Sequence, residues 1–168
     1  MSELDDAVRR WAMGVYPVEA GAELLIRQGK AIVEGAPWLT DIGPVGGQRV
    51  TEIDHVKLWD ESRGWSGSER RIVDIARSLM NSRGRVNLHD AVTGLNRDQL
   101  ELVLAAVAHA AGSHETSRTT STEEQRGNAT LESAFPWPSR YNTIARFRSM
   151  RAQAHDAAGQ AAGPARSL

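Results

Sequence analysis

Residues 65–112 read WSGSERRIVDIARSLMNSRGRVNLHDAVTGLNRDQLELVLAAVAHAAG, and this stretch decides the fold class. Ser66 with Glu69, and Asn96 with Gln99, are spaced as helix-capping boxes, and apolar residues recur at helical spacing after each box. A shorter apolar pattern from Leu88 to Leu95 predicts a two-turn helix between them. The stretch therefore predicts three helices, the last running from Asn96 to a C-terminal cap at Gly112.

The last of these helices is apolar on nearly every side, which is typical of a helix central to a core or to an oligomer. We expect Leu104 to lie at the centre of its buried stripe. Residues 85–87 can form one short strand, for which residues 50–53 are the candidate neighbour. The resulting order of helix, strand, helix, turn and helix is partly similar to a winged helix-turn-helix.

Before this stretch, the sequence of the N-terminal half predicts two helices and a small β-element. Ser2 and Asp5 form another candidate capping box, and Pro17 suits the first turn of a second helix that ends at Gly29. Short extended runs punctuated by glycine and proline follow up to Asp54, and a brief helix is expected over residues 55–61. The fold class predicted is mainly α, a compact helical domain with a minor short-stranded β-element and a flexible, partly helical C-terminal tail.

Composition changes after Gly112 and divides the chain. We expect a compact domain over residues 1–112, a disordered linker over 113–130, an interaction segment over 131–155 and a disordered terminus over 156–168. The linker lacks hydrophobic periodicity, whereas the interaction segment combines large apolar side chains with arginines. Its candidate partner-binding residues are Phe135, Trp137, Tyr141, Ile144, Phe147, Met150, Arg146 and Arg148.

Bulk composition excludes several classes of function. The chain has 168 residues, no cysteine and a formal net charge of −1. Disulfide frameworks and thiolate chemistry are therefore excluded, and any binding to nucleic acid must come from a local patch. No run approaches the roughly 18 apolar residues of a membrane span, and the acidic N-terminus lacks the pattern of a signal peptide. We expect a cytoplasmic protein without a membrane partner.

The strings WAMGVYPVEAGAELLIRQG and WSGSERRIVDIARSLM, with VNLHDAVTGLNRDQLELVLAAVAHAAGSHE, resemble a group of small proteins from high-GC Gram-positive bacteria. The resemblance covers roughly the first 115 residues. It implies a compact, recurring domain with a variable tail, and it implies no activity, cofactor or catalytic residue.

Three groups of residues are candidates for a binding or catalytic site. If the helix-turn-helix-like segment binds DNA, its base-reading residues are Asn96, Arg97 and Gln99, although the neighbouring carboxylates disfavour phosphate contact and no wing is predicted. A second, weaker candidate for DNA binding is a group of arginines that lie close together in the sequence. Such a group more commonly forms a basic face exposed to solvent. The arginines are Arg70, Arg71, Arg77, Arg83 and Arg85.

The histidines and carboxylates show no spacing that fixes a metal site or a catalytic triad. His89, His109, His114 and Glu115 are the candidate ligands considered, and His109 fits a histidine held within the core. We therefore expect neither an enzyme nor a cofactor. The favoured function is an accessory protein that binds a protein partner or itself through the apolar helix and the tail, and the alternative is a DNA-binding regulator.

Overall fold

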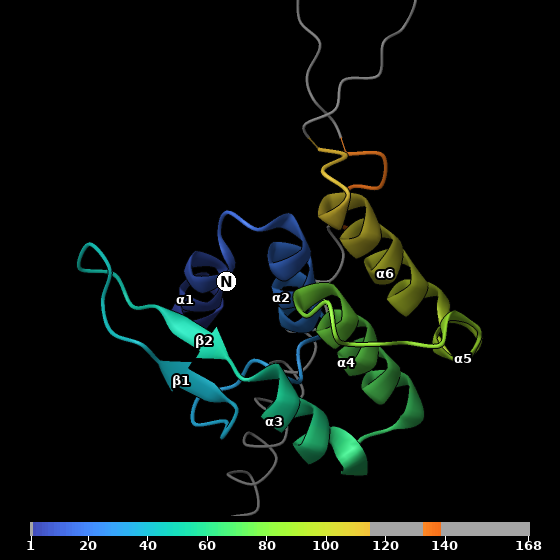
Figure 1. Cartoon of the computed structure of the whole chain (residues 1–168), viewed down its shortest axis with the longest axis horizontal. Helices are drawn as coiled ribbons and strands as arrows, with labels where there is room; N and C mark the ends of the chain where they lie inside the picture. Colours follow the sequence, from blue (N-terminus) through green and yellow to red (C-terminus); the bar gives the residue numbers. More distant parts are fainter. Residues whose placement is uncertain (1, 115–132, 139–168) are drawn as a thin grey trace, which may run out of the picture. The chain divides into compact units, whose positions relative to one another are not determined.

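Helices dominate the structure, a computed structural model that describes residues 2–114 and 133–138. The elements are α1 (Glu3–Ala12), α2 (Tyr16–Gln28), β1 (Leu39–Asp41), β2 (Thr51–Ile53), α3 (His55–Glu61), the 3₁₀ turn η1 (Ser62–Gly64), α4 (Gly67–Met80), α5 (Leu88–Thr93) and α6 (Arg97–Ala110) (Figure 1). The predicted fold class, mainly α with a minor β-element, is confirmed. None of these helices combines the length and apolar character needed to cross a membrane.

The predicted capping boxes fix where three helices begin. The Ser2 hydroxyl accepts a hydrogen bond from the Asp5 amide, and the Asp5 carboxylate accepts one from the Ser2 amide. Ser66 with Glu69 opens α4, and Asn96 with Gln99 opens α6, by the same reciprocal pairing. These side chains satisfy amide groups that have no partner inside the helix, which is why the sequence locates these boundaries well.

Helix α2 is the centre of the helical packing, with its most extensive contacts against α4 and α6. Leu24 and Leu25 on α2, Ile72 on α4 and Leu102 on α6 retain no exposed surface. A β-carbon at Gly21 would lie 2.9 Å from the carbonyl oxygen of Ala76 and closer still to the Met80 side chain. The glycine therefore allows the backbones of α2 and α4 to approach closely.

The β-element is a small antiparallel hairpin that supports α1. Leu39 faces Ile53, and Asp41 faces Thr51, across the two strands. Strand β2 packs against α1, and Ile53 is buried. At the base of the hairpin the buried indole of Trp38 donates to the carbonyl of Ala31 at 2.8 Å.

The strand expected at residues 85–87 is wrong. These residues form no strand, and the Asn87 side chain instead caps α5 by accepting a hydrogen bond from the His89 amide. Strand β2 pairs with β1 and not with residues 85–87. A three-residue extended run is stable as a strand only when it pairs with another strand, and residues 85–87 pair with neither strand of the hairpin. The segment is therefore a helix, a loop, a short helix, a turn and a helix.

The expected position of Leu104 in the core is also wrong. Leu104 is 38% exposed, whereas Leu102, Ala105 and Ala106 on the other side of α6 are buried. Because α6 is apolar on nearly every side, its hydrophobic pattern permitted more than one buried face. The structure selects the face on which the alanines allow close approach to α2.

Two substitutions on α6 test which face is buried. Leu102→Ala removes a fully buried side chain and should lower the free energy of unfolding by about 2–5 kcal/mol, whereas Leu104→Ala should lower it by roughly 1 kcal/mol or less. Urea unfolding monitored by circular dichroism measures both. Equal losses, or a larger loss for Leu104→Ala, would contradict the orientation of α6.

Candidate functional site

The outward side of α6 presents a row of aliphatic residues to solvent. Leu100, Leu104 and Val107 are 39%, 38% and 51% exposed, and their spacing of four and three residues places them on one side of the helix. We call Leu100, Leu104 and Val107 the α6 face. Exposed aliphatic residues are ordinary one at a time, but a row on one helix is typical of an interaction surface.

The three residues considered for base reading lie at the N-terminus of α6, as the sequence predicted. Asn96 and Gln99 are joined in the capping box, with hydrogen bonds of 2.8 and 3.1 Å between each side chain and the amide of the other. Arg97 is almost fully exposed, and its nearest carboxylate is Glu101 at 3.6 Å. Arg97 thus has the freedom to reach a ligand, while the other two side chains hold the helix start.

Part of the predicted interaction segment packs against the helices. The Trp137 ring lies against the Arg27 guanidinium, at 5.2 Å, and tilted beside the His109 ring, at 6.2 Å. Arg27 also donates to the carbonyl of Pro138, and Ser133 pairs with Ser113 at 3.0 Å. Phe135 is 52% exposed. Residues 133–138 therefore contact α2 and α6, with Trp137 as the anchor.

The remaining candidates of that segment lie outside the described residues, so their role stays a prediction. They are Tyr141, Ile144, Phe147, Met150, Arg146 and Arg148. Glu115, considered as a metal ligand, lies outside them as well.

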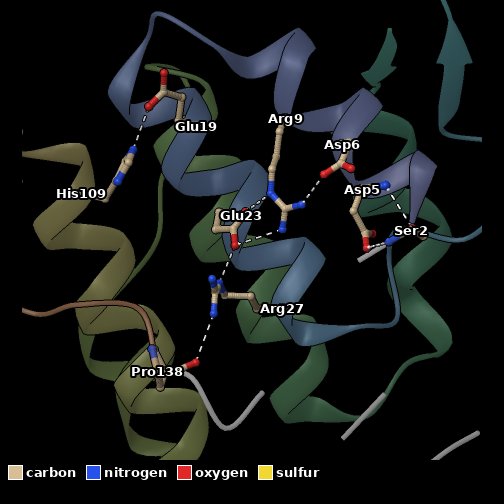
Figure 2. Close-up of polar contacts among 9 residues, drawn as sticks. All are labelled: Ser2, Asp5, Asp6, Arg9, Glu19, Glu23, Arg27, His109 and Pro138. Atoms are coloured by element: carbon tan, nitrogen blue, oxygen red, sulfur yellow. Dashed lines mark hydrogen bonds and ion pairs between the residues drawn. The ribbon is translucent and has the colours of Figure 1, made fainter. Parts of the chain in front are cut away.

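A charged network links α1, α2 and residues 133–138, which it reaches at Pro138 (Figure 2). Arg9 on α1 pairs with Asp6 at 3.0 Å and with Glu23 on α2 at 2.8 Å. Glu23 also accepts from Arg27 at 2.5 Å, and Arg27 continues to the Pro138 carbonyl. Burial tends to raise the pKa of Glu23, but the two guanidinium groups outweigh it and hold the pKa below its ordinary value.

A second polar pair joins α2 to α6. The His109 ring donates to Glu19 at 2.8 Å, as Figure 2 shows. His109 stacks on His114 with ring centres 4.3 Å apart, and the Tyr16 ring meets both edge-on. Burial raises the pKa of Glu19, whereas hydrogen bonds from His109 and the Gly14 amide lower it by more, so the net shift is downward.

The two networks border a small cavity that Trp137 helps to line. Its volume is about 220 Å³, and its other walls include Ala12, Met13 and His109. This is below the usual range of roughly 300–1,000 Å³ for small-molecule sites. Within residues 2–114 and 133–138, no group of three or more carboxylate or imidazole side chains converges to hold a metal ion.

Sequence reasoning missed both networks. Glu19 and His109 are 90 positions apart, and Arg9 and Glu23 are 14 apart. No spacing rule connects residues on different helices, so only the packing of α1, α2 and α6 could reveal the pairs. The available signals were the helical spacing of Asp6 with Arg9 and of Glu23 with Arg27, and His109 as a polar residue in the apolar C-terminal half of α6.

Comparisons with known proteins supply no further assignment: no protein-family model matches the chain, and neither a curated protein nor a solved structure is significantly similar to it.

Acid should weaken the network at Glu23. Because the pKa of Glu23 is lower in the folded state than in the unfolded state, its stabilisation is present above the unfolded pKa and is lost as pH falls through the folded pKa. Glu23→Gln should lower the free energy of unfolding at pH 7 by about 1–3 kcal/mol, since two arginines lose their partner. It should also flatten the decline below about pH 4.5.

Urea unfolding from pH 7 to pH 3 measures this dependence. The matched control is Glu52→Gln, which neutralises an exposed carboxylate on β2 outside the network. A stability profile for Glu23→Gln that overlays the control would show that the network contributes nothing.

Proposed function

We propose that this chain is a non-enzymatic interaction protein that binds through the α6 face, with a second copy of the chain as the partner. The observation that carries the proposal is the exposed aliphatic row Leu100, Leu104 and Val107 on a helix whose opposite side is buried against α2. Removing these side chains from water stabilises an association by roughly 25 cal/mol for each Å² of apolar surface buried.

A second copy suits this face because a two-fold pairing places the same patch on both sides of the interface. The face spans eight residues, or about 10 Å of helix, so the row on one helix can lie along the row on another. Arg97 and Glu101 beside it carry opposite charges, and two copies therefore do not repel each other there. The segment that follows Gly112 is proposed to extend the contact, with Trp137 already held on α2 and α6.

A charge placed on the α6 face should abolish this association. Leu104→Glu should convert the protein to a monomer at concentrations where the wild type self-associates, with little change in melting temperature because Leu104 is partly exposed. Light scattering coupled to size-exclusion chromatography measures the mass. The control is Val56→Glu on α3, where the valine is 50% exposed but does not belong to the α6 face.

A wild-type protein that stays monomeric at every concentration would overturn self-association. Loss of association in Val56→Glu to the same extent would show that the effect is not specific to the α6 face.

The second candidate is a DNA-binding regulator that reads bases with the N-terminus of α6. The exposure of Arg97 favours it, and the engagement of Asn96 and Gln99 in the capping box weighs against it, as does the absence of any strand after α6 within the described residues. This function requires a preferred sequence: Arg97→Ala should lower affinity for one defined duplex by about 1–3 kcal/mol while affinity for other duplexes changes less. Competition binding between two duplexes measures the difference, and equal losses on both would exclude base reading by Arg97.

A further inference from the structure

The arginines of α4 surround a groove separate from the α6 face. The groove has a volume of about 410 Å³ and lies between α3, α4, α5 and the loop before α5. Arg70, Arg71 and Arg77 reach it from α4, and Arg85 reaches it from the loop. Four of the five arginines that cluster in the sequence are therefore gathered at one site.

Within the part of the chain that the structure describes, these four guanidinium groups have no carboxylate partner. Among residues 2–114 and 133–138, no aspartate or glutamate oxygen lies within 4.0 Å of a nitrogen of Arg70, Arg71, Arg77 or Arg85. Elsewhere Arg9, Arg27 and Arg49 are each paired with at least one carboxylate. The Nε atom of Arg77 is also buried and has no hydrogen-bond partner among the described residues. A buried donor without an acceptor costs free energy, so no hydrogen bond at Nε offsets the burial of this atom.

The groove holds its arginines in place. Arg71 Nε donates to the carbonyl of Asp90 at 2.8 Å, and its guanidinium packs against the backbone of Gly94 so closely that a β-carbon there would overlap it. Arg70 and Arg77 lie over the Trp59 ring at 5.4 and 4.9 Å. Because these groups are already ordered, a ligand would lose less entropy on binding them than on binding free surface arginines.

The charge of the groove is positive although the chain as a whole carries −1. Two aspartates line it beside the four arginines, and one of them, Asp74, accepts a hydrogen bond from the Trp59 indole at 2.7 Å. The planar guanidinium fork matches the oxygens of phosphate better than an ammonium group does. An anionic ligand with phosphate groups fits this combination of charge and geometry.

We propose that this groove binds the phosphodiester backbone of duplex nucleic acid. The basic surface extends beyond the groove lining, because Arg63 lies over the groove-lining Trp59 ring at 5.5 Å and the exposed Arg83 precedes Arg85 by two residues. That extension fits a long polyanion rather than a single small phosphate. The guanidinium groups of Arg63, Arg70 and Arg77 lie over the Trp59 ring, where they compete with the base stacking that single strands use.

Affinity for the phosphodiester backbone depends steeply on salt concentration and little on base sequence. Fluorescence anisotropy with a labelled duplex DNA about two helical turns long measures both. Arg71→Gln and Arg85→Gln should each weaken binding about tenfold at low salt, because each removes about one hydrogen bond to a charged group. Each should also reduce the slope of log affinity against log salt concentration by about one. The control Lys57→Gln removes the same charge from an exposed position on α3 that does not line the groove.

A second variant keeps every charge and changes only the position of one. Gly94→Ala should displace the Arg71 guanidinium, which is the flexible end of its side chain, so the protein should stay folded while binding weakens. Gly64→Ala is the matched control, because a β-carbon there meets no atom within 4 Å. Thermal melts of all variants separate loss of binding from loss of fold.

The expected result is salt-dependent binding of duplex DNA that Arg71→Gln, Arg85→Gln and Gly94→Ala weaken and that the two controls leave unchanged. The proposal is overturned if the wild type does not bind duplex at low salt, or if Arg71→Gln and Gly94→Ala bind as their controls do. It is also overturned if inorganic pyrophosphate binds the groove but duplex DNA does not compete with it, which would make the groove a site for small phosphates.

Discussion

The close packing of α2 against α4 and α6 is the constraint on which the other features depend. Gly21 allows α4 to approach, and the alanines on the inner side of α6 allow the same on the other flank. Once these alanines face inward, the larger residues Leu100, Leu104 and Val107 must face outward, because a helix has only one side toward its neighbour. The exposed α6 face is thus a consequence of how the core is packed.

Local signals made some features of this fold predictable. The capping boxes located the starts of α1, α4 and α6 because each box is complete within four residues and satisfies its own amides. The helix over residues 55–61 was predicted with its observed limits. Signals that require a distant partner were less informative, and the strand expected at residues 85–87 failed because these residues pair with neither strand of the hairpin.

The orientation of α6 could not be predicted for a related reason. Hydrophobic periodicity identifies a buried face only when the other face is polar, and this helix has leucine, valine or alanine on both. The pairing of His109 with Glu19 was equally hidden, since the two residues meet only after α2 and α6 are in contact. The sequence could supply the residue types of the candidate sites, but their grouping depends on tertiary packing.

Arginine illustrates why composition alone does not reveal function in this chain. On α1 and α2, Arg9 and Arg27 share Glu23 and join two helices to the segment that carries Trp137. On α4, Arg70, Arg71 and Arg77 are ordered by an indole ring and a backbone carbonyl and have no carboxylate partner among the described residues. A guanidinium paired with a buried carboxylate has its charge balanced internally, and it therefore contributes to folding more than to binding. A guanidinium that is held in place without such a partner leaves its charge for a ligand, which is the physical basis for separating the structural arginines of this protein from those of its groove.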